Sequence, residues 1–121
     1  MGEFVMKKVA SGVKFDLRAG NGEVIATSEV YKTEAACRKG IQSVRKNAPK
    51  ALLEDQTAGS AVLPNPKFEL YQDKAGLFRF RLRSRNGHII AVSEAYATRQ
   101  GCADGIESVK NNIIFEENPN F

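Results

Sequence analysis

Four arginines at alternating positions have the spacing best suited to binding chemistry in this sequence. They are Arg79, Arg81, Arg83 and Arg85, and they alternate with Phe78, Phe80, Leu82 and Ser84. Side chains at i and i+2 of a β-strand share one face, about 7 Å apart. The first three arginines would therefore line one face of a strand, with Arg85 at the edge of the next turn. Such a row is suited to bidentate binding of phosphates or of an acidic partner.

The same row also has a purely structural interpretation, as a solvated sheet face. The expected strand registers place Glu69 opposite Arg81 and Glu94 opposite Arg79. Cross-strand ion pairs of this kind are common in sheets. The sequence supports both interpretations.

A second candidate site lies where a strand gives way to a helix. It combines Ser93, Glu94 and Tyr96, and the same residue types recur at Ser28, Glu29 and Tyr31. Hydroxyl, carboxylate and phenol together could perform acid–base chemistry. At such a junction, however, polar groups more often satisfy backbone donors while the tyrosine anchors the loop. We expect the structural role.

Motifs for metal, cofactor or covalent chemistry do not occur in the sequence. His88 is the only histidine, and no group of His, Cys and acidic residues has ligand spacing. Nucleophile-elbow and phosphate-loop patterns do not occur. Cys37 and Cys102 lie on apolar helical stripes typical of buried, reduced thiols, and a disulfide would need their Cα atoms within about 7 Å. We expect no metal, no cofactor and no enzymatic activity.

Composition and charge further narrow the class of protein to which this chain can belong. Of the 121 residues, 42% are hydrophobic and 26% are charged, as in a globular chain. The net charge of +4 is too mild to indicate nucleic-acid binding by itself. No apolar run approaches the roughly 20 residues that cross a bilayer, and the first residues lack the apolar centre of a signal peptide. We expect a cytoplasmic protein without membrane contact.

The unit that must position these residues occurs twice. Residues 78–112 align with residues 13–47, and 17 of the 35 aligned positions are identical, where chance would give roughly two. Each copy is near the size at which a lone core is marginal, so the copies should share one core. We predict a single domain at 1–121, with a first repeat at 3–55, a linker at 56–66 and a second repeat at 67–117.

Each repeat is predicted to have the order β-β-β-α-β. Apolar alternation predicts the strands, and Asn21-Gly22 and Asn86-Gly87 predict type I′ hairpin turns. After Thr33 and Thr98, which are expected N-caps, the apolar spacing becomes helical. We predict helices over 34–46 and 99–111, followed by terminal strands over 51–55 and 113–117.

Inside the predicted helices, glycine occurs twice at the same repeat position, as Gly40 and Gly105. An interior glycine costs about 1 kcal/mol relative to alanine. Its recurrence indicates a close backbone approach at that point.

The sheet face away from the helices is expected to be open. On this face, the third strand of each repeat is expected to place its side chains outward; they are Ile25 and Thr27 in the first repeat and Ile90 and Val92 in the second. With Tyr71 and the arginines they make a mixed apolar and basic surface, suited to an interaction but also compatible with an ordinary surface. The residues that we predict to bind a partner are Arg79, Arg81, Arg83, Arg85, Tyr71 and Ile90.

Several runs in the second repeat carry a family resemblance. They are Lys67-Phe68-Glu69-Leu70-Tyr71, Asp73-Lys74-Ala75-Gly76, Phe78-Arg79-Phe80-Arg81-Leu82, Asn86-Gly87, Ser93-Glu94-x-Tyr96 and Gly105-Ile106-x-Ser108-Val109-Lys110-Asn111. As a set they resemble the YegP-like family of small bacterial proteins of uncharacterised function. The resemblance implies an α+β fold: a tandem β3-α-β repeat with pseudo-two-fold symmetry, a single antiparallel sheet with exchanged terminal strands, and both helices on one face. It brings no established activity.

We therefore predict a small cytosolic, non-enzymatic module that binds another macromolecule, protein or nucleic acid, through its open sheet face. The alternative is a small-ligand-binding protein or enzyme with a site near Ser93, Glu94 and Tyr96. Family members with one copy are expected to form homodimers, so the tandem repeat is expected to make this chain a monomer.

Overall fold

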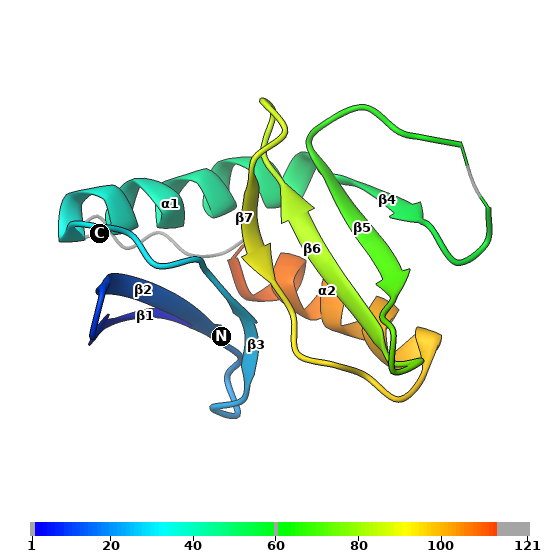
Figure 1. The fold of residues 1–121 in the computed structure, drawn as a ribbon, viewed down its shortest axis with the longest axis horizontal. Coiled ribbons are helices and arrows are strands. Elements are labelled where there is room, and N and C mark those ends of the chain that lie inside the picture. The colour runs from blue at the N-terminus through cyan, green and yellow to red at the C-terminus, as the bar shows by residue number, and fades with distance from the viewer. Residues whose placement is uncertain (1, 60, 114–121) are drawn as a thin grey trace.

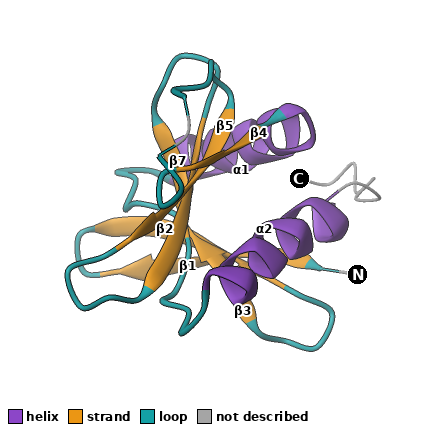
Figure 2. Ribbon diagram, turned by 90° about the vertical axis from the view of Figure 1, so that its right-hand side faces the viewer, coloured by secondary structure: helices purple, strands orange, loops and turns teal. Residues whose placement is uncertain are grey.

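The computed structural model is an α+β protein with one seven-stranded sheet and two helices on the same face of it (Figures 1 and 2). It describes residues 2–59 and 61–113. The strands are β1 (Glu3–Val9), β2 (Gly12–Arg18), β3 (Val24–Thr27), β4 (Leu52–Asp55), β5 (Lys67–Gln72), β6 (Phe78–Arg83) and β7 (Ile89–Val92). The two α-helices are α1 (Glu34–Asn47) and α2 (Arg99–Ile113), and a short 3-10 helix, η1 (Ala48–Lys50), follows α1.

The strand order β1-β2-β3-β7-β6-β5-β4 joins the two repeats at the centre of the sheet. The joining pair is Thr27 opposite Val92, which are equivalent positions of the two repeats. The pseudo-two-fold axis therefore passes between β3 and β7, as the tandem repeat predicts.

The exchange of the terminal strand is confirmed for the first repeat, because β4 pairs with β5 of the second. The prediction of a wholly antiparallel sheet needs a correction, since this pair is parallel. Pro66, just before β5, lies at the starting end of β4, where the Leu52 amide donates to the Pro66 carbonyl. The equivalent terminal strand was predicted at 113–117. Ile113 ends α2 instead, and 114–117 lie outside the described residues.

The hairpins at the two Asn-Gly sites form, but their turns differ from the prediction. Gly22 and Gly87 have φ of 87° and 88°, and among the described residues no other residue type has a positive φ. A type I′ turn would require a positive φ at the asparagines as well. Instead, the Ala19 carbonyl accepts from the Gly22 amide, and the Ala19 amide donates to Glu23. The result is a longer loop with its glycine in the left-handed region.

A β-bulge in each third strand corrects a second prediction. Leu17 pairs with Ala26, but Arg18 pairs with Val24, so Ile25 is an extra residue. Ile90 is the extra residue of the second repeat, between the partners of Leu82 and Arg83. Bulges break the alternation of faces and re-aim side chains. Ile25 and Ile90 were predicted to face outward, but they belong to the core and are only 6% and 7% exposed.

The helices cover the core as the apolar periodicity predicts. Their buried positions are Cys37, Ile41 and Val44 in α1 and Cys102, Ile106 and Val109 in α2. Thr33 and Thr98 are the predicted caps, and each side chain accepts from the amide three residues later. Both cysteines are free and buried, and burial raises the pKa of Cys102 to about 11.

Candidate functional site

The structure brings four of the predicted partner-binding residues together on the sheet face away from the helices. Tyr71 on β5 lies opposite Arg79 on β6, and Arg81 and Arg83 follow on the same face of β6. The side chains of these arginines are 27% to 40% exposed. The row predicted from the alternating spacing therefore forms, and it is partly accessible.

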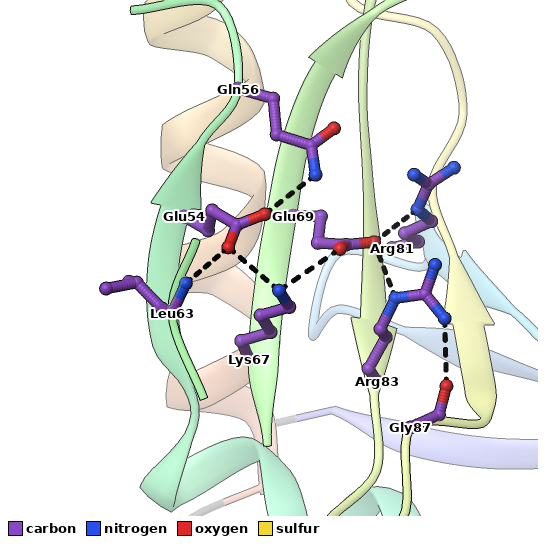
Figure 3. A network of polar contacts seen from close by, with 8 residues as sticks. All are labelled: Glu54, Gln56, Leu63, Lys67, Glu69, Arg81, Arg83 and Gly87. Atoms are coloured by element: carbon purple, nitrogen blue, oxygen red, sulfur yellow. Dashed lines mark hydrogen bonds and ion pairs between the residues drawn. The ribbon is translucent and has the colours of Figure 1, made fainter. Parts of the chain in front are cut away.

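The row is held by a buried carboxylate on the neighbouring strand, as Figure 3 shows. Glu69 Oε1 accepts from Nε of Arg81 at 2.5 Å and from Nε of Arg83 at 2.8 Å. Nζ of Lys67 lies 3.5 Å from the other oxygen of Glu69. Burial by itself would raise the pKa of Glu69, but the hydrogen bonds from the two arginines lower it below its ordinary value. The predicted pairing of Glu69 with Arg81 is confirmed.

The charge network continues from Lys67 into the exchanged strand β4 (Figure 3). Nζ of Lys67 donates to Glu54 at 2.8 Å, and both residues are almost fully buried. Glu54 also accepts from the side chain of Gln56 and from the backbone amide of Leu63. Hydrogen bonds from Gln56, Lys67 and Leu63 lower the pKa of Glu54 to about 2. The linker thus helps to bury a strong ion pair.

Arg79 has a different partner from the one expected. Its Nε donates to Asp73 at 2.8 Å, at the edge of the hairpin loop between β5 and β6, while Glu94 is exposed. Arg81 also lies over the ring of Tyr71, 4.4 Å from its centroid, an arrangement in which the ring face attracts the cation. Each guanidinium is therefore fixed by a neighbour.

The first repeat carries a smaller version of this arrangement. Asp16 on β2 is bound by Lys7 at 2.7 Å and by Lys14 at 3.8 Å, and it accepts from the Thr27 hydroxyl. Burial would raise the pKa of Asp16, but Lys7 and Thr27 lower it. A buried carboxylate among cations is common to both repeats, whereas the arginine row belongs only to the second.

Two predicted partner-binding residues lie apart from the row. Ile90 is turned into the core by the bulge, so the prediction that it lies on the open face is wrong. Arg85 is exposed on the turn after β6, where its backbone amide donates to the side chain of Asn47 at 3.1 Å. The sequence did not indicate Glu54, Lys67 or Asp73 as members of the site, because their roles depend on strand pairing and loop closure.

The residues of the alternative site around Ser93 make hydrogen bonds and packing contacts within the protein. Oγ of Ser93 accepts from the Phe80 amide at 2.8 Å and donates to the Glu94 carbonyl. The Tyr96 ring stacks on Phe80, and its hydroxyl end lies against Gly105. Burial raises the pKa of Tyr96. These contacts satisfy backbone groups and anchor the loop, which is the structural role expected for them.

In residues 2–59 and 61–113, no three His, Cys, Asp or Glu side chains gather as a metal site would require. None of the described helices is both long and apolar enough to cross a membrane.

The fold and the charged face define a small α+β tandem-repeat protein with buried carboxylates on its outer sheet face. Residues 10–55 and 73–114 match a family model described as "Domain of unknown function (DUF1508)". The chain belongs to the UPF0339, or YegP, family, with two tandem DUF1508 repeats.

Relatives and solved structures agree with this assignment. The chain is 40% identical over 106 residues to UPF0339 protein YegP of Escherichia coli O157:H7, covering 88% of this chain and 84% of the relative. A UPF0339 protein of Bordetella pertussis is 38% identical, and the match covers 92% of this chain and 87% of the relative. The solution structure of the E. coli protein of unknown function yegP superposes with a TM-score of 0.75 at 37% identity, over 95% and 88%. The solution structure of UPF0339 protein SO3888 from Shewanella oneidensis superposes with a TM-score of 0.73 at 32% identity, and the match covers 92% of this chain and 83% of the other.

Proposed function

We propose that the protein is a non-enzymatic module that binds the acidic surface of a protein partner through the outer face of the second repeat. The observation that carries this proposal is the group formed by Tyr71, Arg79, Arg81 and Arg83. Tyrosine and arginine are enriched at protein interfaces and among their energetic hot spots. Here both types lie side by side on a partly exposed sheet face.

The arginines are also ordered before any partner arrives. Glu69 and Asp73 bind them through Nε, so less side-chain entropy is lost on binding than with free arginines. Pre-ordering of this kind supports a fixed geometry for bidentate pairing with carboxylates.

The mixture of charges favours a protein over a nucleic acid. The carboxylates of Glu54, Glu69 and Asp73 lie within the cluster and offset three of its four positive charges, those of Lys67, Arg79, Arg81 and Arg83. A phosphate backbone is bound best by a surface on which cations dominate. A protein surface with its own mixture of apolar and acidic groups suits this face better.

The test is capture of partners from lysate on the immobilised protein, with and without nuclease, using Arg79→Ala/Arg81→Lys/Arg83→Lys. Charge reversal is unsuitable because it would leave Glu69 buried without its partners. The lysines keep charge beside Glu69 but lack the planar fork of arginine. We expect a specific protein to be captured regardless of nuclease and at least about tenfold less of it by the variant.

A matched control is Lys14→Ala, which removes a cation from the same face of the first repeat. It should leave capture unchanged. Equal capture by the triple variant, at an unchanged melting temperature, would refute the assigned face. Capture that disappears on nuclease treatment would refute the protein partner.

A further inference from the structure

A hollow of about 820 Å³ lies between α1, η1, Asn65 and Pro66 just before β5, and the turn between β6 and β7. Figure 1 shows this turn beside the C-terminal end of α1. The volume is within the usual range for small-molecule sites, roughly 300–1,000 Å³. The hollow lies apart from the arginine row and has no part in the function proposed above.

The lining of the hollow is strongly basic. Lys39 and Lys46 come from α1, Lys50 from η1 and Arg85 from the turn, and the other described lining residues are Ser, Asn, Gln and one Pro. No Asp or Glu occurs among these described lining residues. On the outer sheet face, by contrast, Glu69 and Asp16 bind the cations around them. A concave surface with only cations attracts a multiply charged anion.

The two sides of the hollow are joined by a buried hydrogen-bonded residue. Asn47 accepts from the Arg85 amide at 3.1 Å, and its Nδ2 donates to the Ser43 carbonyl at 2.8 Å. This side chain therefore fixes the turn against the helix. The walls that carry the cations come from both repeats but are held in one arrangement.

Comparison of the two repeats shows that the fold does not require this charge. The scaffold residues Ser43 and Asn47 recur as Ser108 and Asn112, with the same hydrogen bonds between them. The cations do not recur: Lys39, Lys46 and Arg85 correspond to Asp104, Asn111 and Gly20. The same framework is therefore basic around one helix and not around the other.

The helix dipole accounts for only part of the difference. Cations near a helix C-terminus are favourable, and Arg45 and Lys46 fill that role in the last turn of α1, as Lys110 does in α2. Lys39 lies in the middle of α1, beyond the reach of the last turn. The helix dipole also has no bearing on Arg85, which lies on a turn.

We infer that the hollow binds a small ligand carrying two or more phosphate groups. Lysine and arginine side chains around a concavity bind phosphates through charge-assisted hydrogen bonds, and the amides and hydroxyls between them suit the ligand's other polar groups. Nucleic acid fits less well, because single strands are normally bound by stacking of bases on aromatic side chains, and the described lining contains none.

The test uses sodium tripolyphosphate as the probe in isothermal titration calorimetry at about 0.1 M salt, where the Debye length is about 10 Å. The variant Lys39→Asp/Lys46→Asn/Arg85→Gly places in the hollow the residues that the other repeat carries at equivalent positions, so it should fold. We expect binding by the unaltered protein and about 100-fold weaker binding by this variant, since several charge-assisted contacts are lost.

The control variant Lys8→Asp/Lys32→Asn/Lys74→Asn removes the same total charge at exposed positions outside the hollow. It should keep the affinity within about threefold, because long-range charge is largely screened. The assignment would be overturned if the unaltered protein failed to bind millimolar tripolyphosphate, or if both variants weakened it equally. Single-stranded DNA that displaced the probe and bound more tightly would overturn the small-ligand class.

Discussion

At the scale of single residues, the recurring glycines show how closely the helices approach the sheet. The sequence indicated a close backbone approach at Gly40 and Gly105, and the structure identifies what approaches them. It is the side chain of a tyrosine from the same repeat, Tyr31 or Tyr96. The same tyrosines stack on Phe15 and Phe80. Glycine, tyrosine and phenylalanine therefore form one packing unit, present twice.

We predict that Gly105→Ala destabilises the protein by about 1–3 kcal/mol, measured by urea denaturation. An added Cβ would lie 2.8 Å from Cζ of Tyr96 and 3.1 Å from the ring of Phe80, and the better helix propensity of alanine does not offset this crowding. The control is Gly101→Ala in the same helix, whose nearest neighbour would be the Thr98 hydroxyl at 3.1 Å. It should be neutral or stabilising by up to about 1 kcal/mol. Equal stability of the two variants would contradict the packing argument.

At the scale of elements, the exchanged strand β4 depends on a buried ion pair. Glu54 on β4 and Lys67 on β5 are paired at 2.8 Å, and the linker closes over them through Leu63. Breaking a buried pair leaves an uncompensated charge and is strongly destabilising. The apolar side chains of β4, Leu52 and Leu53, are exposed. Beyond the backbone ladder with β5, the attachment of β4 to the second repeat is therefore electrostatic.

The pKa of about 2 for Glu54, against an ordinary 4.5, gives this attachment a defined pH dependence. Because the folded-state pKa is lowered, the carboxylate stabilises the fold above about pH 4.5, and the contribution is lost as pH falls toward 2. We expect Glu54→Gln to cost about 3 kcal/mol at pH 7. The difference from the unaltered protein should shrink between pH 5 and pH 2.5 in chemical denaturation.

The control for this pH series is Glu107→Gln, which removes an exposed carboxylate of α2. Its stability should follow that of the unaltered protein at every pH. A Glu54→Gln penalty that stayed constant down to pH 2.5 would show that packing, and not the carboxylate charge, holds β4.

At the scale of the whole molecule, the chain contains both halves of a pseudo-symmetric object. β3 and β7 join the sheet at equivalent positions, Thr27 and Val92, and β4 carries the first repeat into the second. The two halves share a scaffold but differ in charge, with arginines on one outer face and lysines on the other. A tandem chain permits such divergence, whereas a homodimer would keep its two halves identical.

We predict that the protein is a monomer of 13.3 kDa in sedimentation velocity across a hundredfold range of concentration. The pairing that a single-repeat chain would obtain from a second copy is made here within one chain. A parallel series at 1 M salt identifies any association that is driven by charge, because salt screens attraction between charges. A mass that rose toward twice the monomer value with concentration would contradict the prediction.

The sequence by itself determined the repeat, the element order and most of the pairing. Glu69 opposite Arg81 follows from alternation and loop length, since a shift by one residue would turn every side chain to the wrong face. The apolar stripes of the helices and the threonine caps could also be predicted, because they depend only on residues close together in the sequence. Tyr71 and the arginines could be placed on one face for the same reason.

The tertiary structure alone decided which of those residues are bound, buried or accessible. The bulge that buries Ile90, the parallel pairing of β4 and the Glu54–Lys67–Glu69 network all depend on contacts between segments that local periodicity does not relate. The basic hollow also needs two distant segments, although comparing Lys39 with Asp104 between repeats would have signalled it. Periodicity determines the face on which a side chain lies, whereas its partners come from whichever strand, loop or helix the fold packs beside it.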